Sequence, residues 1–484
     1  MSSPGPMPNC DLLVIGAGPA GLAAATCAAE LGLDTVLIDE QPAPGGQIYR
    51  AIGSTPVQDR AILGADYWHG LDLLEPFRRC STRYIAGAMV WAVNRLEDGK
   101  FEVAYTTTAD HQAHLLLARH VTLATGAQER PFPIPGWTLP GVITAGAAQI
   151  LLKTSGVVPE GTTVLAGGGP LLYLLAWQYL NAGVKIHSIL QTTPPGQWRH
   201  ALPHAWGFLR SPYLGKGMKL LSAVRAAVPI VTGVTAIEAL PGPGTGQLAE
   251  LRYSAGGKTR TLAVDQLLLH QGVVPNTNLS RAIGADHAWS DRQDCWEPAV
   301  DAFGATSLPQ LTIAGDGAGI VGAVAAEHRG RLAALHAAAS LGHIDSKARD
   351  RAAAPHRAAL ARAARGREFF ETLYRAAPAL RRPVGDTIVC RCEEVTAEQV
   401  RQAARMGCQG PNQMKAFLRC GMGPCQGRFC GLTVTELIAD EQGRHPRDVG
   451  YYRIRFPIKP VTLGEIATLP QTDESRSAVV RFKK

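Results

Sequence analysis

The chain has 484 residues, of which 46% are apolar and 18% charged, with a formal net charge of +8 at pH 7. A chain of this length is too long to form one compact core, so about two to four domains are expected. The apolar content excludes an intrinsically disordered protein. The basic excess lies in arginine-rich segments without interleaved aromatic residues, so nucleic acid is not an expected partner.

Residues 11–39 are predicted to form a strand, a glycine turn, a helix and a second strand. The turn has the spacing G-x-G-x-x-G, in which backbone N–H groups and the helix N-terminus can receive a pyrophosphate. A carboxylate at the end of the second strand can accept hydrogen bonds from ribose hydroxyls. The predicted nucleotide-binding residues are Gly16, Gly18, Pro19, Ala20, Gly21, Asp39 and Glu40.

Three further glycine turns follow along the chain: Gly45-Gly46-Gln47, Ala124-Thr125-Gly126 and Ala314-Gly315-Asp316-Gly317. With the first turn they resemble the two-dinucleotide-domain flavoproteins of the pyridine nucleotide–disulfide oxidoreductase superfamily, over roughly residues 10–335. The resemblance implies FAD, with the ribityl chain held by Asp316. It adds Gly46, Gln47, Thr125, Gly126, Gly315 and Asp316 to the cofactor residues. No cysteine follows Gly46 closely and none lies in residues 140–270, so disulfide reductase activity is not expected.

A second strand–turn–helix–strand unit is predicted over residues 161–191. It keeps Gly167 and Gly169 of the fingerprint but has Leu172 at the third glycine position, and no carboxylate ends its second strand. We therefore expect a retained fold with weakened NAD(P) binding; the alternative is a nucleotide bound in another way. At the end of a later strand, His270 is the candidate acid–base residue near a flavin, or else a hydrogen-bonded structural histidine.

The predicted fold class is α/β, with two nested Rossmann-like domains followed by a small, mainly helical domain. Residues 1–138 and 271–343 form the nucleotide-binding domain, and residues 139–270 form the degenerate NAD(P)-binding-like domain. An alanine- and arginine-rich helical connector spans 344–385, the cysteine domain spans 386–445, and a basic tail spans 446–484.

Six of the ten cysteines lie in residues 390–430, where two close pairs have the spacing C-x-C-x₃₂-C-x₄-C. Thiolates grouped in this way bind soft metal centres. Residues 388–395 and 415–430 resemble the bacterioferritin-associated ferredoxin-like domain, which implies a 2Fe–2S cluster; structural zinc or a metal-free domain are the alternatives. The resemblance puts ligation on Cys390, Cys392, Cys425 and Cys430. Cys420 is close enough in sequence to be an alternative ligand.

Nearly the whole chain resembles the alpha (A-type) subunits of multi-subunit bacterial amine dehydrogenases, a group that includes opine oxidases, hydrogen cyanide synthases, and D-hydroxyproline and L-proline dehydrogenases. The shared stretches are residues 135–142, 169–174 and 315–320. The resemblance implies an electron-transfer subunit whose substrate, an amino or imino acid, is oxidised on a separate FAD-bearing beta subunit of the glycine/sarcosine oxidase type. A small 2Fe–2S gamma subunit, FMN at a subunit interface, and ATP in place of FAD at the first site are further implied features.

Two other functions are compatible with the motifs. The first is a stand-alone NAD(P)H-dependent FAD/2Fe–2S reductase. The absence of the third fingerprint glycine in residues 161–191, where Leu172 stands instead, argues against it. The second is an iron-handling protein, against which the long flavoprotein portion argues. The chain has no apolar run of about 18 residues and its start lacks a signal-peptide pattern. We therefore expect a cytoplasmic protein without a transmembrane segment, held at the inner face of the membrane only through partners.

Overall fold

The computed structural model describes residues 8–470, and its first domain is built on a parallel sheet. The strand order is β3-β2-β1-β6-β19, and the N-terminal half of the long strand β6 also pairs antiparallel with β5, which pairs with β4. Strand β1 is almost continuously apolar and buried, as expected for a parallel strand covered on both faces. The strands are β1 (Asn9–Ile15), β2 (Thr35–Ile38), β3 (Arg83–Ile85), β4 (Ala88–Arg95), β5 (Phe101–Thr107), β6 (Ala113–Leu123) and β19 (Leu311–Ile313).

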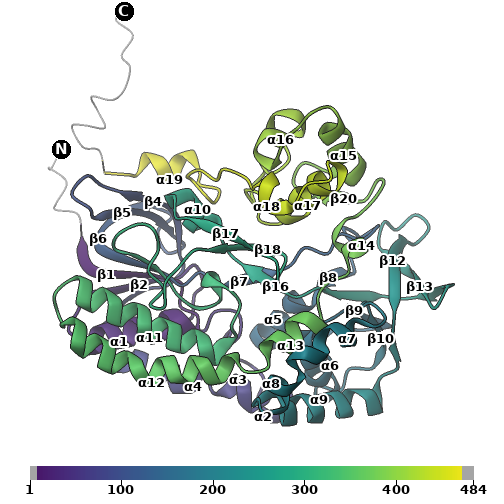
Figure 1. The fold of residues 1–484 in the computed structure, drawn as a ribbon, viewed down its shortest axis with the longest axis horizontal. Helices are drawn as coiled ribbons and strands as arrows, with labels where there is room; N and C mark the ends of the chain where they lie inside the picture. Colours follow the sequence, from purple (N-terminus) through teal and green to yellow (C-terminus); the bar gives the residue numbers. More distant parts are fainter. Residues whose placement is uncertain (1–7, 471–484) are drawn as a thin grey trace, which may run out of the picture.

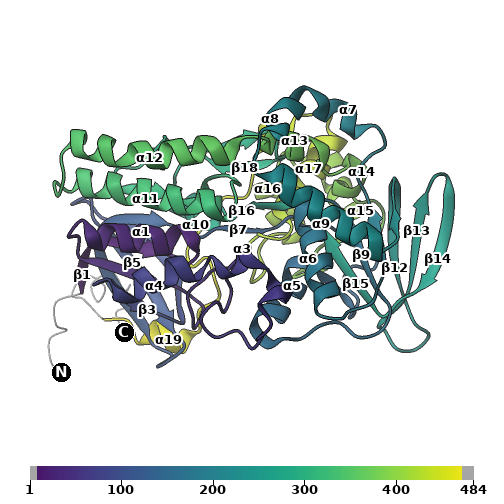
Figure 2. The same cartoon turned by 90° about the horizontal axis from the view of Figure 1, so that it is seen from below.

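Small residues let three long helices stack on one face of this sheet. A side chain on Gly330 would lie 2.1 Å from the carbonyl oxygen of Ala20, so α1 and α11 approach at backbone distance. Figure 2 shows α1, α11 and α12 as successive rows. The helices of this domain are α1 (Pro19–Glu30), α2 (Arg60–Leu63), α3 (Ala65–Trp68), α4 (Leu71–Arg79), α11 (Ala323–Ser340) and, from the connector, α12 (Ser346–Ala364).

The second domain contains its own parallel sheet in the order β11-β10-β9-β15-β8. A three-stranded antiparallel sheet, β12-β13-β14, projects at its outer end (Figure 2). The strands are β8 (Val142–Thr144), β9 (Thr163–Gly167), β10 (Ile186–Gln191), β11 (Ile230–Val231), β12 (Val234–Pro241), β13 (Leu248–Ala255), β14 (Lys258–Ala263) and β15 (Gln266–His270). The helices are α5 (Ala145–Ser155), α6 (Pro170–Asn181), α7 (Gln197–Ala201), η1 (Leu202–His204), α8 (Ala205–Leu209) and α9 (Tyr213–Ala227). The predicted α/β class with two Rossmann-like sheets is confirmed.

The chain crosses between the two domains at a pair of short antiparallel strands, β7 and β16. A hairpin, β17-β18, follows the return crossing, and a 3₁₀ turn, η2, carries the predicted Asp316. The elements are β7 (Ala127–Glu129), β16 (Val273–Pro275), α10 (Asn278–Ile283), β17 (His287–Ser290), β18 (Cys295–Pro298) and η2 (Gly315–Ala318).

The cysteine domain forms a small helical lobe above the junction of the two Rossmann-like domains (Figure 1). The connector reaches it through α12, α13 (Arg367–Leu373) and α14 (Pro378–Arg381). The lobe contains β20 (Ile388–Cys390), β21 (Val395–Thr396), α15 (Ala397–Arg405), α16 (Pro411–Leu418), α17 (Gly431–Glu441) and α18 (Pro446–Val449).

The tail beyond the lobe returns over the first sheet. The N–H group of Ile458 donates to the carbonyl of Trp91 on β4, and Thr468, after α19 (Leu463–Ala467), accepts from the N–H group of Ala113 on β6. The end of the predicted tail, residues 471–484, lies outside the described residues. Within residues 8–470, no helix combines the length and apolarity needed to cross a bilayer.

Candidate functional site

The first glycine turn, Gly16–Gly21, has no room for side chains at Gly16 and Gly21. Gly16 has a φ of +107°, and a side chain on Gly21 would lie 1.7 Å from the carbonyl oxygen of Gly16. A side chain on Gly46 would lie 2.7 Å from the Cα atom of Gly18, so the Gly45-Gly46-Gln47 loop packs against the first glycine turn. No side chain of the described residues caps the start of α1. Its N–H groups are therefore open to a pyrophosphate.

The two predicted acids at the end of β2 have different surroundings. Asp39 is buried and accepts hydrogen bonds from the N–H groups of Ala17 (2.5 Å) and Gln41 (2.7 Å). Burial raises the pKa of Asp39, against the opposing effect of these two bonds. Glu40 is half exposed and forms an ion pair with Lys459 of the tail. Asp39 thus holds the turn in place, and the tail reaches the ribose end of the predicted site.

The predicted loops on the other side of the site meet one another. One carboxylate oxygen of Asp316 accepts from the N–H groups of Val321 (2.7 Å) and Gly322 (2.9 Å), which fixes the turn before α11. A side chain on Gly317 would lie 3.4 Å from the nitrogen of Gly126, so the turns after β6 and β19 lie side by side. The structure therefore gathers both loops beside the first glycine turn, at the carboxyl edge of one sheet.

Two cations next to the Gly45-Gly46-Gln47 loop were not predicted. Arg50 is 9% exposed, and its Nε atom has no hydrogen-bond partner among the described residues. Lys153, on α5 of the second domain, is 1% exposed and donates to the carbonyl oxygens of Gln47 (3.2 Å) and Ile48 (2.9 Å). A buried, unpartnered guanidinium N–H beside a glycine cradle fits a cofactor that carries phosphate.

Lys153 should make stability depend on pH. Burial lowers the pKa of Lys153 to about 7 from its usual 10.5. Between these values the unfolded chain binds a proton that the folded chain has released. The free energy of unfolding should therefore rise with pH above about 7, by up to about 1.4 kcal/mol per pH unit. Urea unfolding should show this slope in the wild type and lose it in Lys153→Met. The exposed Lys185→Met control should retain it, and a slope unchanged by Lys153→Met would contradict the assignment.

Two side chains from other segments contact the glycine turn of the second domain, Gly167-Gly168-Gly169. A side chain on Gly168 would lie 3.4 Å from the Oγ1 atom of Thr193 and 3.8 Å from the ring of Tyr374, which comes from the connector. His270 is 3% exposed beside this turn, and its Nδ1 atom lies 2.7 Å from a carboxylate oxygen of Glu129 on β7. The structure thus places His270 at the second turn, and its predicted acid–base role stays a prediction.

Three cysteine sulfur atoms converge inside the helical lobe. The Sγ atoms of Cys390, Cys420 and Cys430 lie within 4.8 Å of one another, and all three residues are buried. Hydrogen bonds from the thiols of Cys420 and Cys430 lower the pKa of Cys390. Cys392 is exposed, and a side chain on Gly423 would lie 3.1 Å from its sulfur, so Cys392 lies beside the loop that carries Cys425. The structure therefore brings Cys390 together with Cys430, and Cys392 together with Cys425, while Cys420 joins the first group.

Glycines and one tyrosine hold these cysteine loops. Side chains on Gly421 and Gly427 would lie 2.4 and 2.5 Å from the ring of Tyr452, so both loops press against that ring. The Tyr452 hydroxyl lies 3.6 Å from the sulfur of Cys430. Five thiols in and beside one buried group supply the four thiolates that a 2Fe–2S cluster or a structural zinc requires. The donor set fits a soft metal centre.

The loop between the last two predicted ligands, Cys425 and Cys430, is hydrogen-bonded to strand β7 and helix α10. The side-chain amide of Gln128 on β7 donates to the carbonyl of Arg428 at 2.6 Å, and that of Asn278 donates to the carbonyl of Gln426 at 3.0 Å. Gln128 lies two residues beyond Gly126, whose carbonyl accepts from the N–H group of Asn276. The cysteine centre is therefore attached to the segment that borders the first nucleotide site.

Known families and proteins resemble this chain along nearly its whole length. Residues 10–342 match the pyridine nucleotide-disulphide oxidoreductase family, and residues 385–469 match the sarcosine oxidase A3 domain. The chain is 46% identical to the A-type subunit of opine oxidase from Agrobacterium tumefaciens, over 97% of this chain and 93% of the relative. It is 33% identical to the HcnB subunit of hydrogen cyanide synthase from Pseudomonas aeruginosa, over 95% of this chain and 99% of the relative.

A solved structure shares the fold. L-proline dehydrogenase from P. horikoshii superposes with a TM-score of 0.70 at 18% identity, covering 96% of this chain and 81% of that chain. The family matches and the relatives confirm the resemblance expected from the glycine turns and the cysteine pairs. The chain belongs to the pyridine nucleotide-disulphide oxidoreductase family and, within it, to the A-type subunits of multi-subunit flavin-dependent amine oxidases and dehydrogenases.

Proposed function

We propose that the chain is the electron-transfer (alpha) subunit of a heteromeric flavin-dependent dehydrogenase. The complex oxidises the C–N bond of an amino or imino acid of the D-hydroxyproline, proline, opine or glycine type. One observation carries the proposal: the loop that leads to Cys430, one of a buried group of cysteines, is hydrogen-bonded to Gln128 of β7 and Asn278 of α10, next to a nucleotide site. The similarity to an opine oxidase component along the whole chain supports the same function.

The residues of the first site would hold FAD, with ATP as the alternative occupant. The glycine turns would receive the pyrophosphate, Asp39 the ribose, and the loops at Thr125 and Asp316 the flavin end. A 2Fe–2S cluster would be held by Cys390, Cys392, Cys425 and Cys430, with Cys420 as an alternative ligand. When bound, a flavin exchanges two electrons and such a cluster exchanges one.

We place the oxidation of the substrate on a partner. An FAD-bearing beta subunit of the glycine/sarcosine oxidase type would carry the substrate pocket, a small 2Fe–2S gamma subunit would complete the complex, and FMN would lie at a subunit interface. The acceptor would be a dye or quinone, reached by a cytoplasmic complex at the inner face of the membrane. The names of the relatives, which are subunits of multi-subunit oxidases, support the existence of partners.

Removing the two amide contacts should slow electron transfer without removing the cluster. In Gln128→Ala/Asn278→Ala, the loop that contains Gln426 and Arg428 loses both bonds to the nucleotide domain. A displacement of reacting groups by about 1 Å can lower a rate by about a hundredfold. Stopped-flow absorbance should show slower cluster reduction at unchanged iron content. The exposed Gln247→Ala should behave as the wild type, and an unchanged rate in the double variant would disprove the positioning role.

Co-purification tests the proposed function. A tagged chain, expressed with its neighbouring genes, should bring down a flavoprotein partner, and the complex should reduce a dye with D-hydroxyproline, L-proline, an opine or glycine. The alternative, a stand-alone NAD(P)H reductase, predicts that NADH bleaches the flavin of the lone chain. Leu172, which is fully buried at the position of the third fingerprint glycine, argues against that outcome. Recovery of no partner, together with NADH oxidation by the lone chain, would overturn the proposal.

A further inference from the structure

A cavity of about 780 Å³ lies where four distant segments of the chain meet. Its walls come from the loop after β10, the β17–β18 hairpin, the connector around α14 and the cysteine lobe around α18. Cavities of this volume accommodate cofactors and other small ligands. The first nucleotide site and the cysteine centre do not contribute to its walls.

The cavity lies at the carboxyl edge of the second sheet. Pro194 and Gln197, which follow β10, line it, and the side chain of Gln197 donates to the carbonyl of Thr372 at 2.7 Å. Ligands of open α/β sheets bind at this edge. The lining residues come from the loop after β10 on one side and from the cysteine lobe on the other, so the open space lies between the second domain and that lobe.

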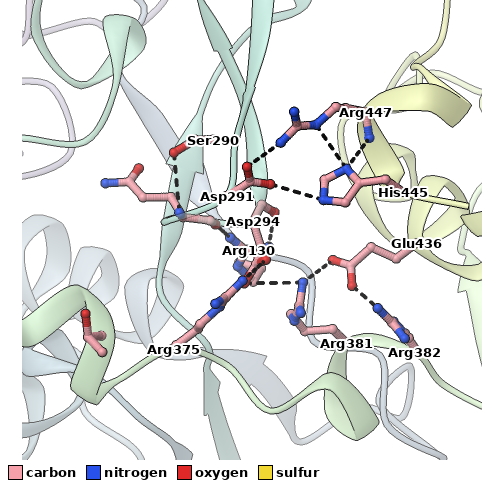
Figure 3. A network of polar contacts seen from close by, with 12 residues as sticks. Arg130, Ser290, Asp291, Asp294, Arg375, Arg381, Arg382, Glu436, His445 and Arg447 are labelled. Atoms are coloured by element: carbon pink, nitrogen blue, oxygen red, sulfur yellow. Dashed lines mark hydrogen bonds and ion pairs between the residues drawn. The ribbon is translucent and has the colours of Figure 1, made fainter. Parts of the chain in front are cut away.

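Positive side chains predominate on the cavity wall. Five arginines line it: Arg292, Arg375, Arg381, Arg382 and Arg444. The wall also includes His200 and His445, and its acids are Asp291 and Asp294. Both acids are already paired, Asp291 with His445 and Arg447, and Asp294 with Arg375 and Arg381 (Figure 3). Behind the wall, further carboxylates pair with the arginines, namely Glu368, Glu371, Glu436 and Asp440.

Polar atoms without partners are concentrated at this junction. Among residues 8–470, 14 buried side-chain atoms have no hydrogen-bond partner. Six of them belong to residues that line the cavity, adjoin a lining residue or contact one: Thr193, Gln293, Glu371, Arg381, Arg382 and Glu436. Arg381 is only 7% exposed, and its Nε–H group is among these donors. The oxygens of Gln293, Glu371 and Glu436 in this group are acceptors, and the Nε atom of Arg382 lies 3.7 Å from a Glu436 oxygen. A buried donor without an acceptor is unfavourable, so the Nε–H group of Arg381 is the one that calls for a ligand or a water.

We propose that this cavity binds a small phosphate-bearing anion, held by the arginines of the β17–β18 hairpin, the connector and the cysteine lobe. Guanidinium groups are suited to this task because they donate two parallel hydrogen bonds to a phosphate. Since the walls belong to separate parts of the chain, an occupant also holds the cysteine lobe against the second domain. The site is distinct from the proposed electron-transfer function, which neither requires nor excludes it.

Calorimetry with two probes tests the proposal. The full-length protein, saturated with FAD, is titrated with inorganic pyrophosphate and, separately, with ADP at low ionic strength. Saturable binding of pyrophosphate is expected; tighter binding of ADP than of pyrophosphate identifies a nucleotide as the preferred ligand, and weaker binding identifies an inorganic or non-nucleotide phosphate.

Substitutions of lining arginines test whether the measured heat of binding comes from the cavity. Arg292→Gln, with a side chain 56% exposed, and Arg382→Gln, at 32%, should each raise the Kd about tenfold, because each loses a charged hydrogen bond to the ligand. Arg405→Gln is the matched control, since Arg405 is an ion-paired arginine of the same lobe that does not line the cavity. Absence of saturable binding by both probes, or equal Kd values in all three variants, would overturn the proposal.

Discussion

Cys390→Ser should yield a protein that keeps its nucleotide but lacks the iron–sulfur absorbance. The sulfur of Cys390 lies within 4.8 Å of those of Cys420 and Cys430, so it is central to the buried group. Loss of supporting contacts alone weakens metal binding by ten- to a hundredfold, and loss of a ligand has a larger effect. We expect iron and acid-labile sulfide to fall below about a tenth of the wild-type content, measured beside the bound flavin.

Three other serine variants define the ligand set. Cys425→Ser should lose the cluster and Cys420→Ser should retain it, because the proposed ligands include Cys425 and leave Cys420 as the alternative. The reverse pattern would replace Cys425 by Cys420 in the set. Cys408→Ser is the control, since Cys408 is buried in the same lobe but donates to the carbonyl of Gly410 at 3.5 Å. Loss of iron in that variant as well would show that the lobe merely unfolds.

Gly21→Ala should destabilise the first domain and abolish nucleotide binding. The added methyl carbon would lie 1.7 Å from the carbonyl oxygen of Gly16, so helix α1 must move away from β1. Overpacking of this kind typically lowers the free energy of unfolding by about 1–3 kcal/mol. The same movement displaces the N–H groups that receive the pyrophosphate. Urea unfolding and the flavin content of the purified protein measure the two effects.

A second glycine-to-alanine change provides the comparison. Gly215 lies on the long helix α9, and a side chain there would meet nothing within 4 Å. Gly215→Ala should raise stability by about 0.5–1 kcal/mol, because alanine favours helix over glycine. If Gly21→Ala bound flavin as well as Gly215→Ala does, the first glycine turn would not be the flavin site.

Local patterns were enough to predict the two Rossmann-like sheets. A strand, a glycine turn and a helix are adjacent in sequence, so their identity follows from residues within one short segment. The same reasoning found Asp39, which the structure places against the first turn. Asp316, which lies in the turn before α11, was predicted from the family resemblance. It also found the replacement of glycine by Leu172, whose side chain is fully buried.

The missed residues depend on contacts between segments far apart in sequence. Lys153 reaches the loop at Gln47 from another domain, and Lys459 reaches Glu40 from the tail. Tyr374 of the connector lies beside Gly168 in the glycine turn of the second domain. The spacing of the cysteines gave Cys420 only as an alternative ligand. The folded lobe shows that its sulfur lies within 4.8 Å of those of the predicted ligands Cys390 and Cys430. Arg50 follows the Gly45-Gly46-Gln47 loop closely in sequence. It was not predicted as a site residue because its burial, which suggests a phosphate-binding role, is known only from the structure.

Anaerobic reduction of the co-purified complex tests the central claim most directly. When a substrate of the partner is added, the electron paramagnetic resonance signal of a reduced 2Fe–2S cluster should appear in the wild type and be absent with Cys390→Ser, while NADH alone should produce no signal. A cluster in this chain that stays oxidised with every substrate of the partner, or that NADH reduces in the lone chain, would contradict its assignment to electron transfer within such a complex.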